Sequence, residues 1–140
     1  MTSNQLTPEF AVRDIAKSLA FYCELLGFKL EYQRPEEGFA LVSIDEAQLM
    51  LDQIGMGRTF GDELQNKHLG LGLNVQIFVE DDVFSRILEA LEAVGYPLYL
   101  ELEEKWYRKD NIEVGNKQFL VGDPDGYLLR FAVNLGSREL

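Results

Sequence analysis

An internal repeat constrains the fold of this 140-residue sequence more than any other feature. Asp14 stands thirteen residues before Gly27, and Asp82 stands thirteen residues before Gly95. Aspartate is a favoured N-cap and glycine a favoured residue after the last helical turn, so each pair is typical of the two ends of one helix. Apolar residues recur between them with the helical period. The repeat therefore predicts two similar helices, one in each half of the chain.

Strand-like runs accompany each predicted helix, one before it and three after it. They cover residues 9–12, 28–32, 39–44 and 49–53 in the first half, and 74–79, 96–102, 117–121 and 127–134 in the second. The sequence Gly122-Asp123-Pro124-Asp125-Gly126 between the last two runs has the composition of a turn. We therefore expect an α+β fold in which β-α-β-β-β occurs twice. The modules cover about 6–55 and 70–135 within a single domain, 1–140.

Charge and composition narrow the set of partners. The chain has 13 basic and 24 acidic residues, a net charge of −11, so its field repels phosphate backbones and anionic lipids. No window is apolar enough for a membrane span, and residues 1–7 show no export signal, so we expect a cytoplasmic protein with neither nucleic acid nor membrane as a partner. Cys23 and His68, one residue of each type, are too few for a structural zinc site.

The tandem unit, together with FYCELLGF at 21–28 and DPDGYLLRF at 123–131, resembles the vicinal oxygen chelate superfamily. That superfamily includes glyoxalase I, the bleomycin resistance proteins and the extradiol dioxygenases, and the resemblance covers about residues 6–134. It implies mixed sheets that curl around a crevice, helices outside, and pairing of modules across a homodimer. The resemblance thus implies a small-molecule site within the crevice.

Strand alternation predicts which side chains face that crevice, because successive side chains point to opposite faces of a sheet. Phe10 and Val12 fit the helix side of the first strand, which leaves Glu9 on the crevice side. The same parity places Gln76 and Phe78 in the crevice on the fifth strand. Arg130, between two apolar residues of the last strand, also points into it.

The metal-dependent members hold a divalent ion with His, Gln or Glu at four crevice positions. The matching positions here carry Thr7, Asp52 (give or take one residue), Asn74 and Arg130. A catalytic ion normally has about three protein ligands, and one carboxylate cannot supply them. An arginine at the fourth position also repels the cation. We therefore expect no metal and no other cofactor. The metal-free bleomycin resistance branch is then the nearest resemblance, and it implies binding of a cationic ligand by acidic and aromatic residues.

Two residues match that branch: Phe39, which begins the third strand, and Asp52. The Trp-Gly pair common before the seventh strand of that branch is missing, so we expect Trp106 and Tyr107, outside regular strand alternation, to supply the aromatic wall. Their alternative role is to cover an edge strand. Phe60 either closes over a ligand or anchors its loop. The predicted ligand-binding set is Glu9, Phe39, Asp52, Phe60, Gln76, Phe78, Trp106, Tyr107 and Arg130, with no catalytic residue.

Three functions remain open at this point. The first is a protein that sequesters a cationic or aromatic compound, such as a bleomycin-like drug, without chemistry. The second is a lyase, isomerase or dioxygenase of the superfamily with an atypical or absent metal, in which Glu9 or Asp52 acts as general base. The third is a housekeeping domain whose fold implies no drug. In each case we expect an ion pair from Arg130 to Glu9 or Asp52.

Overall fold

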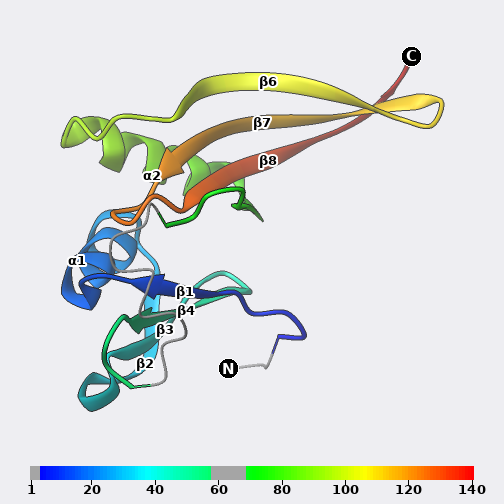
Figure 1. The fold of residues 1–140 in the computed structure, drawn as a ribbon. Helices are drawn as coiled ribbons and strands as arrows, with labels where there is room; N and C mark the ends of the chain where they lie inside the picture. Colours follow the sequence, from blue (N-terminus) through cyan, green and yellow to red (C-terminus); the bar gives the residue numbers. More distant parts are fainter. Residues whose placement is uncertain (1–3, 58–68) are drawn as a thin grey trace. The chain divides into compact units, whose positions relative to one another are not determined.

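The computed structural model describes residues 4–57 and 69–140. The chain forms two compact units, one of Met1–Gly72 with Asp123–Tyr127 and one of Leu73–Gly122 with Leu128–Leu140, which we call unit 1 and unit 2. Each holds a four-stranded mixed sheet and a helical segment (Figure 1). This confirms the predicted α+β class. No helix among the described residues is long and apolar enough to cross a membrane.

The sheet of unit 1 has the strand order β1-β4-β3-β2. Its strands are β1 (Glu9–Val12), β2 (Lys29–Arg34), β3 (Phe39–Ile44) and β4 (Ala47–Gln53). β1 runs parallel to β4, and the other neighbours are antiparallel. All six residues of β3 are buried, as expected for a central strand. The predicted ranges 9–12 and 39–44 are confirmed.

The helical segment of unit 1 begins as predicted. Asp14 is the N-cap of α1 (Ile15–Leu19), and its side chain accepts from the amides of Ala16 and Lys17 at 3.0 and 3.3 Å. The continuation differs, because residues Ala20–Leu25 form a π-helix, η1, with wider turns than the regular period assumes.

The wide turn of η1 changes which side chains reach the core. Phe21 and Tyr22 are consecutive, yet both are buried, and their rings meet edge to face with centroids 5.1 Å apart. The amide of Leu26 donates to the carbonyl of Phe21 at 3.0 Å, five residues back. A period of 3.6 predicts Tyr22 and Leu26 in the core but not Phe21.

The sheet of unit 2 has the order β5-β8-β7-β6, with β5 parallel to β8. Its strands are β5 (Asn74–Phe78), β6 (Leu100–Lys109), β7 (Ile112–Gly122) and β8 (Leu128–Glu139). β6, β7 and β8 continue well beyond the predicted ranges as a long three-stranded arm (Figure 1). The extra residues of β6 and β8 are mostly polar and exposed, so they carry little of the alternation that marks a half-buried strand.

The helix of unit 2, α2 (Asp81–Ala93), packs through Phe84, Ile87 and Leu91. Its start differs from the prediction: Glu80 is the N-cap and makes no side-chain capping bond, while Asp82 lies in the first turn. A carboxylate there still favours the helix through its dipole, so the repeat marked the right region but not the capping residue.

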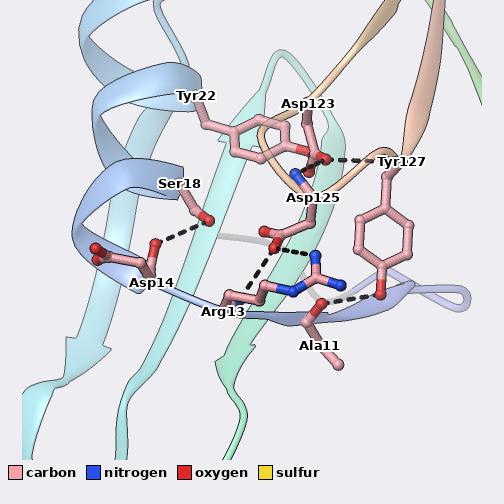
Figure 2. A network of polar contacts seen from close by, with 8 residues as sticks. All are labelled: Ala11, Arg13, Asp14, Ser18, Tyr22, Asp123, Asp125 and Tyr127. Atoms are coloured by element: carbon pink, nitrogen blue, oxygen red, sulfur yellow. Dashed lines mark hydrogen bonds and ion pairs between the residues drawn. The ribbon is translucent and has the colours of Figure 1, made fainter. Parts of the chain in front are cut away.

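The turn between β7 and β8 belongs to unit 1 and is held there by a buried polar network (Figure 2). The Tyr22 hydroxyl donates to Asp123 Oδ2 at 2.7 Å. The amides of Asp125 and Tyr127 each donate to Asp123 Oδ1 at 2.9 Å. Burial raises the Asp123 pKa, and burial followed by the Asp123 charge raises the Tyr22 pKa well above its usual value.

Contacts to β1 complete the attachment of this turn. The Tyr127 ring stacks on Phe10 with centroids 4.1 Å apart. Its hydroxyl donates to the carbonyl of Ala11 at 2.9 Å (Figure 2). The Arg13 guanidinium lies 3.3 Å from Asp125 Oδ1. The turn predicted from composition thus also closes the core of unit 1.

Candidate functional site

Unit 1 has a cavity of about 510 Å³ on its sheet. Three of the predicted ligand-binding residues line it, on β1, β3 and β4, together with four that the sequence did not single out. The lining residues are Glu9, Tyr32, Arg34, Glu37, Phe39, Met50 and Asp52.

Two carboxylates give this cavity its acidic character. Glu9 pairs with Met50 and Ala11 with Asp52 in the β1–β4 register, so Glu9 and Asp52 lie near each other on one face. Asp52 is only 6% exposed. Loss of solvation, and then the Asp52 charge, raises the Glu9 pKa. A cation placed between these carboxylates relieves their mutual repulsion.

Aromatic rings lie beside the carboxylates. The Tyr32 and Phe39 ring centroids are 5.9 Å apart. The Arg34 guanidinium carbon lies 4.1 Å from the Phe39 centroid, and its Nε lies 2.8 Å from a Glu37 carboxylate oxygen. Tyr32 and Arg34 were missed because the alternation was not followed along β2, where they share one parity and therefore one face.

Unit 2 has a second cavity, of about 580 Å³. Four predicted site residues line it: Gln76, Phe78, Tyr107 and Arg130. The other lining residues come from the long arm and are Lys109, Val114, Asn116, Asn134, Gly136 and Ser137. All of these except Asn134 lie in parts of the arm that the predicted strand ranges did not include.

Trp106 does not line this cavity. It stands within β6 opposite Gly115, where a Cβ would come within 2.8 Å of the indole, and the Arg138 guanidinium lies 4.0 Å over the ring. Tyr107 follows it in the same strand and points to the other face. The expectation that both aromatics stand outside strand alternation is therefore wrong. The indole covers its own sheet, which was the alternative role.

Arg130 lies opposite Gln76 in the β5–β8 register and contacts Asn74 diagonally across the pair. Its Nη2 donates to Asn74 Oδ1 at 3.3 Å, and its Nε is buried with no hydrogen-bond partner. None of the ion pairs found within the described part of unit 2 includes Arg130. Glu9 and Asp52 belong to unit 1, so the ion pair expected from Arg130 to one of them stays a prediction.

The donor set gives little support to a metal centre. Across residues 4–57 and 69–140, no three His, Cys, Asp or Glu side chains gather closely enough to hold an ion. Phe60 and His68 lie outside the described residues. Cys23 is half-buried, and burial followed by the Glu24 charge raises its thiol pKa, which disfavours the reactive thiolate.

The two mixed four-stranded sheets, each with a helical segment, define the fold of the glyoxalase and bleomycin resistance class. Residues 4–131 match the family model of the Glyoxalase/Bleomycin resistance protein/Dioxygenase superfamily, and the chain belongs to that superfamily.

Solved structures agree with this fold. A glyoxalase/bleomycin resistance protein/dioxygenase from Alicyclobacillus acidocaldarius is 20% identical with a TM-score of 0.66, covering 94% of this chain and 92% of that one. A lactoylglutathione lyase from Agrobacterium tumefaciens is 16% identical with a TM-score of 0.60, covering 94% of each.

A curated relative matches in sequence over 133 residues at 26% identity: a protein of Bacillus cereus (strain G9842) named CTP synthase. The match covers 84% of this chain and 25% of that protein, so the chain spans about a quarter of its relative's length.

Proposed function

We propose that this protein binds a small cationic or aromatic compound without a metal ion, in the manner of the bleomycin resistance branch. The observation that carries the proposal is the pairing of two carboxylates, Glu9 and Asp52, with the rings of Tyr32 and Phe39 in one cavity of unit 1. Carboxylates supply charge complementarity, and aromatic faces attract planar cations.

Arg34 shows how a planar cation fits this surface. Its guanidinium lies over Phe39 and is paired with Glu37, so the cavity already holds one delocalised cation between a ring and a carboxylate. A cation–π contact contributes about 0.5–2 kcal/mol depending on its exposure. A ligand with an amidinium or guanidinium group can use the same combination against Tyr32, Glu9 and Asp52.

A homodimer belongs to the same proposal, because superfamily members pair modules across two chains. Exposed apolar side chains on the strands of unit 2 support the homodimer, since Phe78 is 50% exposed and Leu102 is 48% exposed. Apolar side chains so placed gain from a partner surface.

Calorimetry with two probes tests the binding proposal. Benzamidine, a planar aromatic cation, and metal-free bleomycin are titrated into the wild type, into Asp52→Asn and into a matched control, Glu36→Gln, which removes the same charge from an exposed residue outside the cavity. We expect Asp52→Asn to weaken binding at least fivefold at low salt and Glu36→Gln to change it less than twofold. Equal losses would assign the effect to net charge, and no heat from either probe would refute the proposal.

An enzyme of the superfamily is the second candidate. The raised pKa of Glu9 supports it, since a carboxylate with a raised pKa is a better general base, and a structural relative carries the name lactoylglutathione lyase. Elemental analysis of the purified protein separates the two. Near one zinc, nickel, manganese or iron ion per chain, lost in Asp52→Ala, would favour the enzyme.

A further inference from the structure

The cavity of unit 2 has the opposite charge character to the chain as a whole. The chain carries a net charge of −11, yet both ionised residues lining this cavity, Lys109 and Arg130, are cations. No carboxylate is among its lining residues. Lys109 makes none of the ion pairs found among the described residues. Two cations without counter-charges in one concave surface attract an anion.

Arg130 holds an unused hydrogen-bond donor in this cavity. Its Nε is the one buried side-chain nitrogen or oxygen among residues 4–57 and 69–140 that has no hydrogen-bond partner. Its Nη2 reaches only the neutral Asn74 amide, at a long 3.3 Å. An unsatisfied buried donor on a charged group is costly, and a carboxylate or phosphate accepts well from a guanidinium.

Neutral donors and an apolar wall surround the two cations. Tyr107 accepts a bond from Gln118 Nε2 at 2.7 Å, which leaves its hydroxyl proton to donate elsewhere. Glu103 is a nearby carboxylate, and it accepts from the same Gln118 nitrogen at 2.8 Å. Phe78, which is 50% exposed, adds an apolar surface.

We propose that the unit 2 cavity binds the oxyanion of a small aromatic acid, with the carboxylate or phosphate on Arg130 and Lys109 and the ring against Phe78 and Tyr107. An oxygen that accepts from Nε satisfies the donor that the fold leaves open. Phosphate and carboxylate share this chemistry. All residues that line this cavity belong to unit 2, and the proposal does not depend on the function proposed for unit 1.

Nuclear magnetic resonance of the ¹⁵N-labelled full chain reads out the proposed contact directly. The Nε–H signal of Arg130, assigned from its absence in Arg130→Gln, is followed during titration with benzoate, phenyl phosphate and benzamidine. We expect both anions to move it saturably, because an oxyanion accepts from this donor. Benzamidine has the same ring and the opposite charge, and we expect it to leave the signal in place.

Substitutions locate the effect. Backbone amide shifts give the affinity in each variant. We expect Arg130→Gln to weaken anion binding at least tenfold and Lys109→Met at least threefold. Arg108→Gln, one residue earlier in β6 and on the opposite face, removes the same charge and is expected to change binding less than twofold. Lys109 is the exposed last residue of β6, so we expect Lys109→Met to fold and to test the site if Arg130→Gln folds poorly.

Three results would overturn the proposal. The first is that neither anion moves the Arg130 Nε–H signal, and the second is that benzamidine moves it as much as the anions do. The third is that Arg108→Gln loses as much anion affinity as Arg130→Gln, which would indicate unspecific attraction. Tighter binding of benzoate or of phenyl phosphate identifies the acid and supports the site in either case. Titration of Asp52→Asn separates the two proposals, since anion binding should survive there whether or not unit 1 binds cations.

Discussion

Tyr22→Phe removes one hydroxyl from the buried network of unit 1 and should destabilise the protein clearly. Tyr22 is fully buried, and its hydroxyl donates to a carboxylate that is 5% exposed. A phenylalanine ring keeps the edge contacts with Phe21 and Phe28, so the loss is confined to the hydrogen bond. A bond to a charged group is worth about 1.5–3 kcal/mol, and Asp123 Oδ2 is left without this donor.

Urea unfolding measures this loss. With a slope of about 2 kcal/mol per molar, a loss of about 2 kcal/mol lowers the unfolding midpoint by about 1 M. Tyr127→Phe is the matched control, because it deletes the same atom from a bond to the neutral carbonyl of Ala11 and should cost about 0.5–1.5 kcal/mol. Equal losses in the two variants, or a loss below about 0.5 kcal/mol in Tyr22→Phe, would refute the reasoning.

The pH dependence of the same variant has a defined sign. Burial raises the pKa of Asp123 in the folded protein, so the stability linked to its protonation is present in acid and is lost as pH rises through the folded-state pKa. The Tyr22 hydrogen bond lowers that pKa and thus limits the loss. Tyr22→Phe should therefore be more destabilising at pH 7 than below about pH 3, where the carboxyl is largely protonated in both states. A loss that does not change with pH would contradict this.

Three further outcomes are expected. Gly115→Ala should destabilise the protein by about 1–3 kcal/mol in thermal unfolding, because the new methyl group meets the Trp106 ring at 2.8 Å; wild-type stability would show that the indole moves freely. Benzamidine affinity should fall on acidification as Glu9, whose pKa is raised, gains a proton, and a flat profile would remove Glu9 from the site. Sedimentation should show a homodimer at micromolar concentration, and a 16.0 kDa species alone would refute it.

The sequence predicted those elements of the fold that an apolar run or a capping residue marks. Strands 9–12 and 39–44 are bounded by their apolar runs, and Asp14 bonds the amides that an N-cap should bond. The outer part of the arm of β6, β7 and β8 could not be recognised, because most of its residues in β6 and β8 are polar and exposed and show little alternation. The π-helix η1 buries the consecutive residues Phe21 and Tyr22, and a 3.6-residue period does not predict that both are buried.

Strand parity predicted four of the nine site residues, because it needs only the alternation of side chains along one strand. Glu9, Gln76, Phe78 and Arg130 follow it and line the cavities that the structure shows. Trp106 lies within β6 and lines neither of these two cavities. Alternation along β2 alone would have indicated Arg34, whereas Lys109 lies in the part of β6 that the predicted range did not include.

The membership of Asp123–Tyr127 in unit 1 means that the two repeats are not separable pieces of polypeptide. A fragment that ends at residue 72 would lack the aromatic ring that stacks on Phe10 and the carboxylate that receives the Tyr22 hydroxyl. A fragment cut there would leave the apolar surface around Phe10 uncovered until residues 123–127 were supplied by the rest of the chain. Unit 1 therefore completes its interior only when residues 123–127 return to it from the far end of the second repeat.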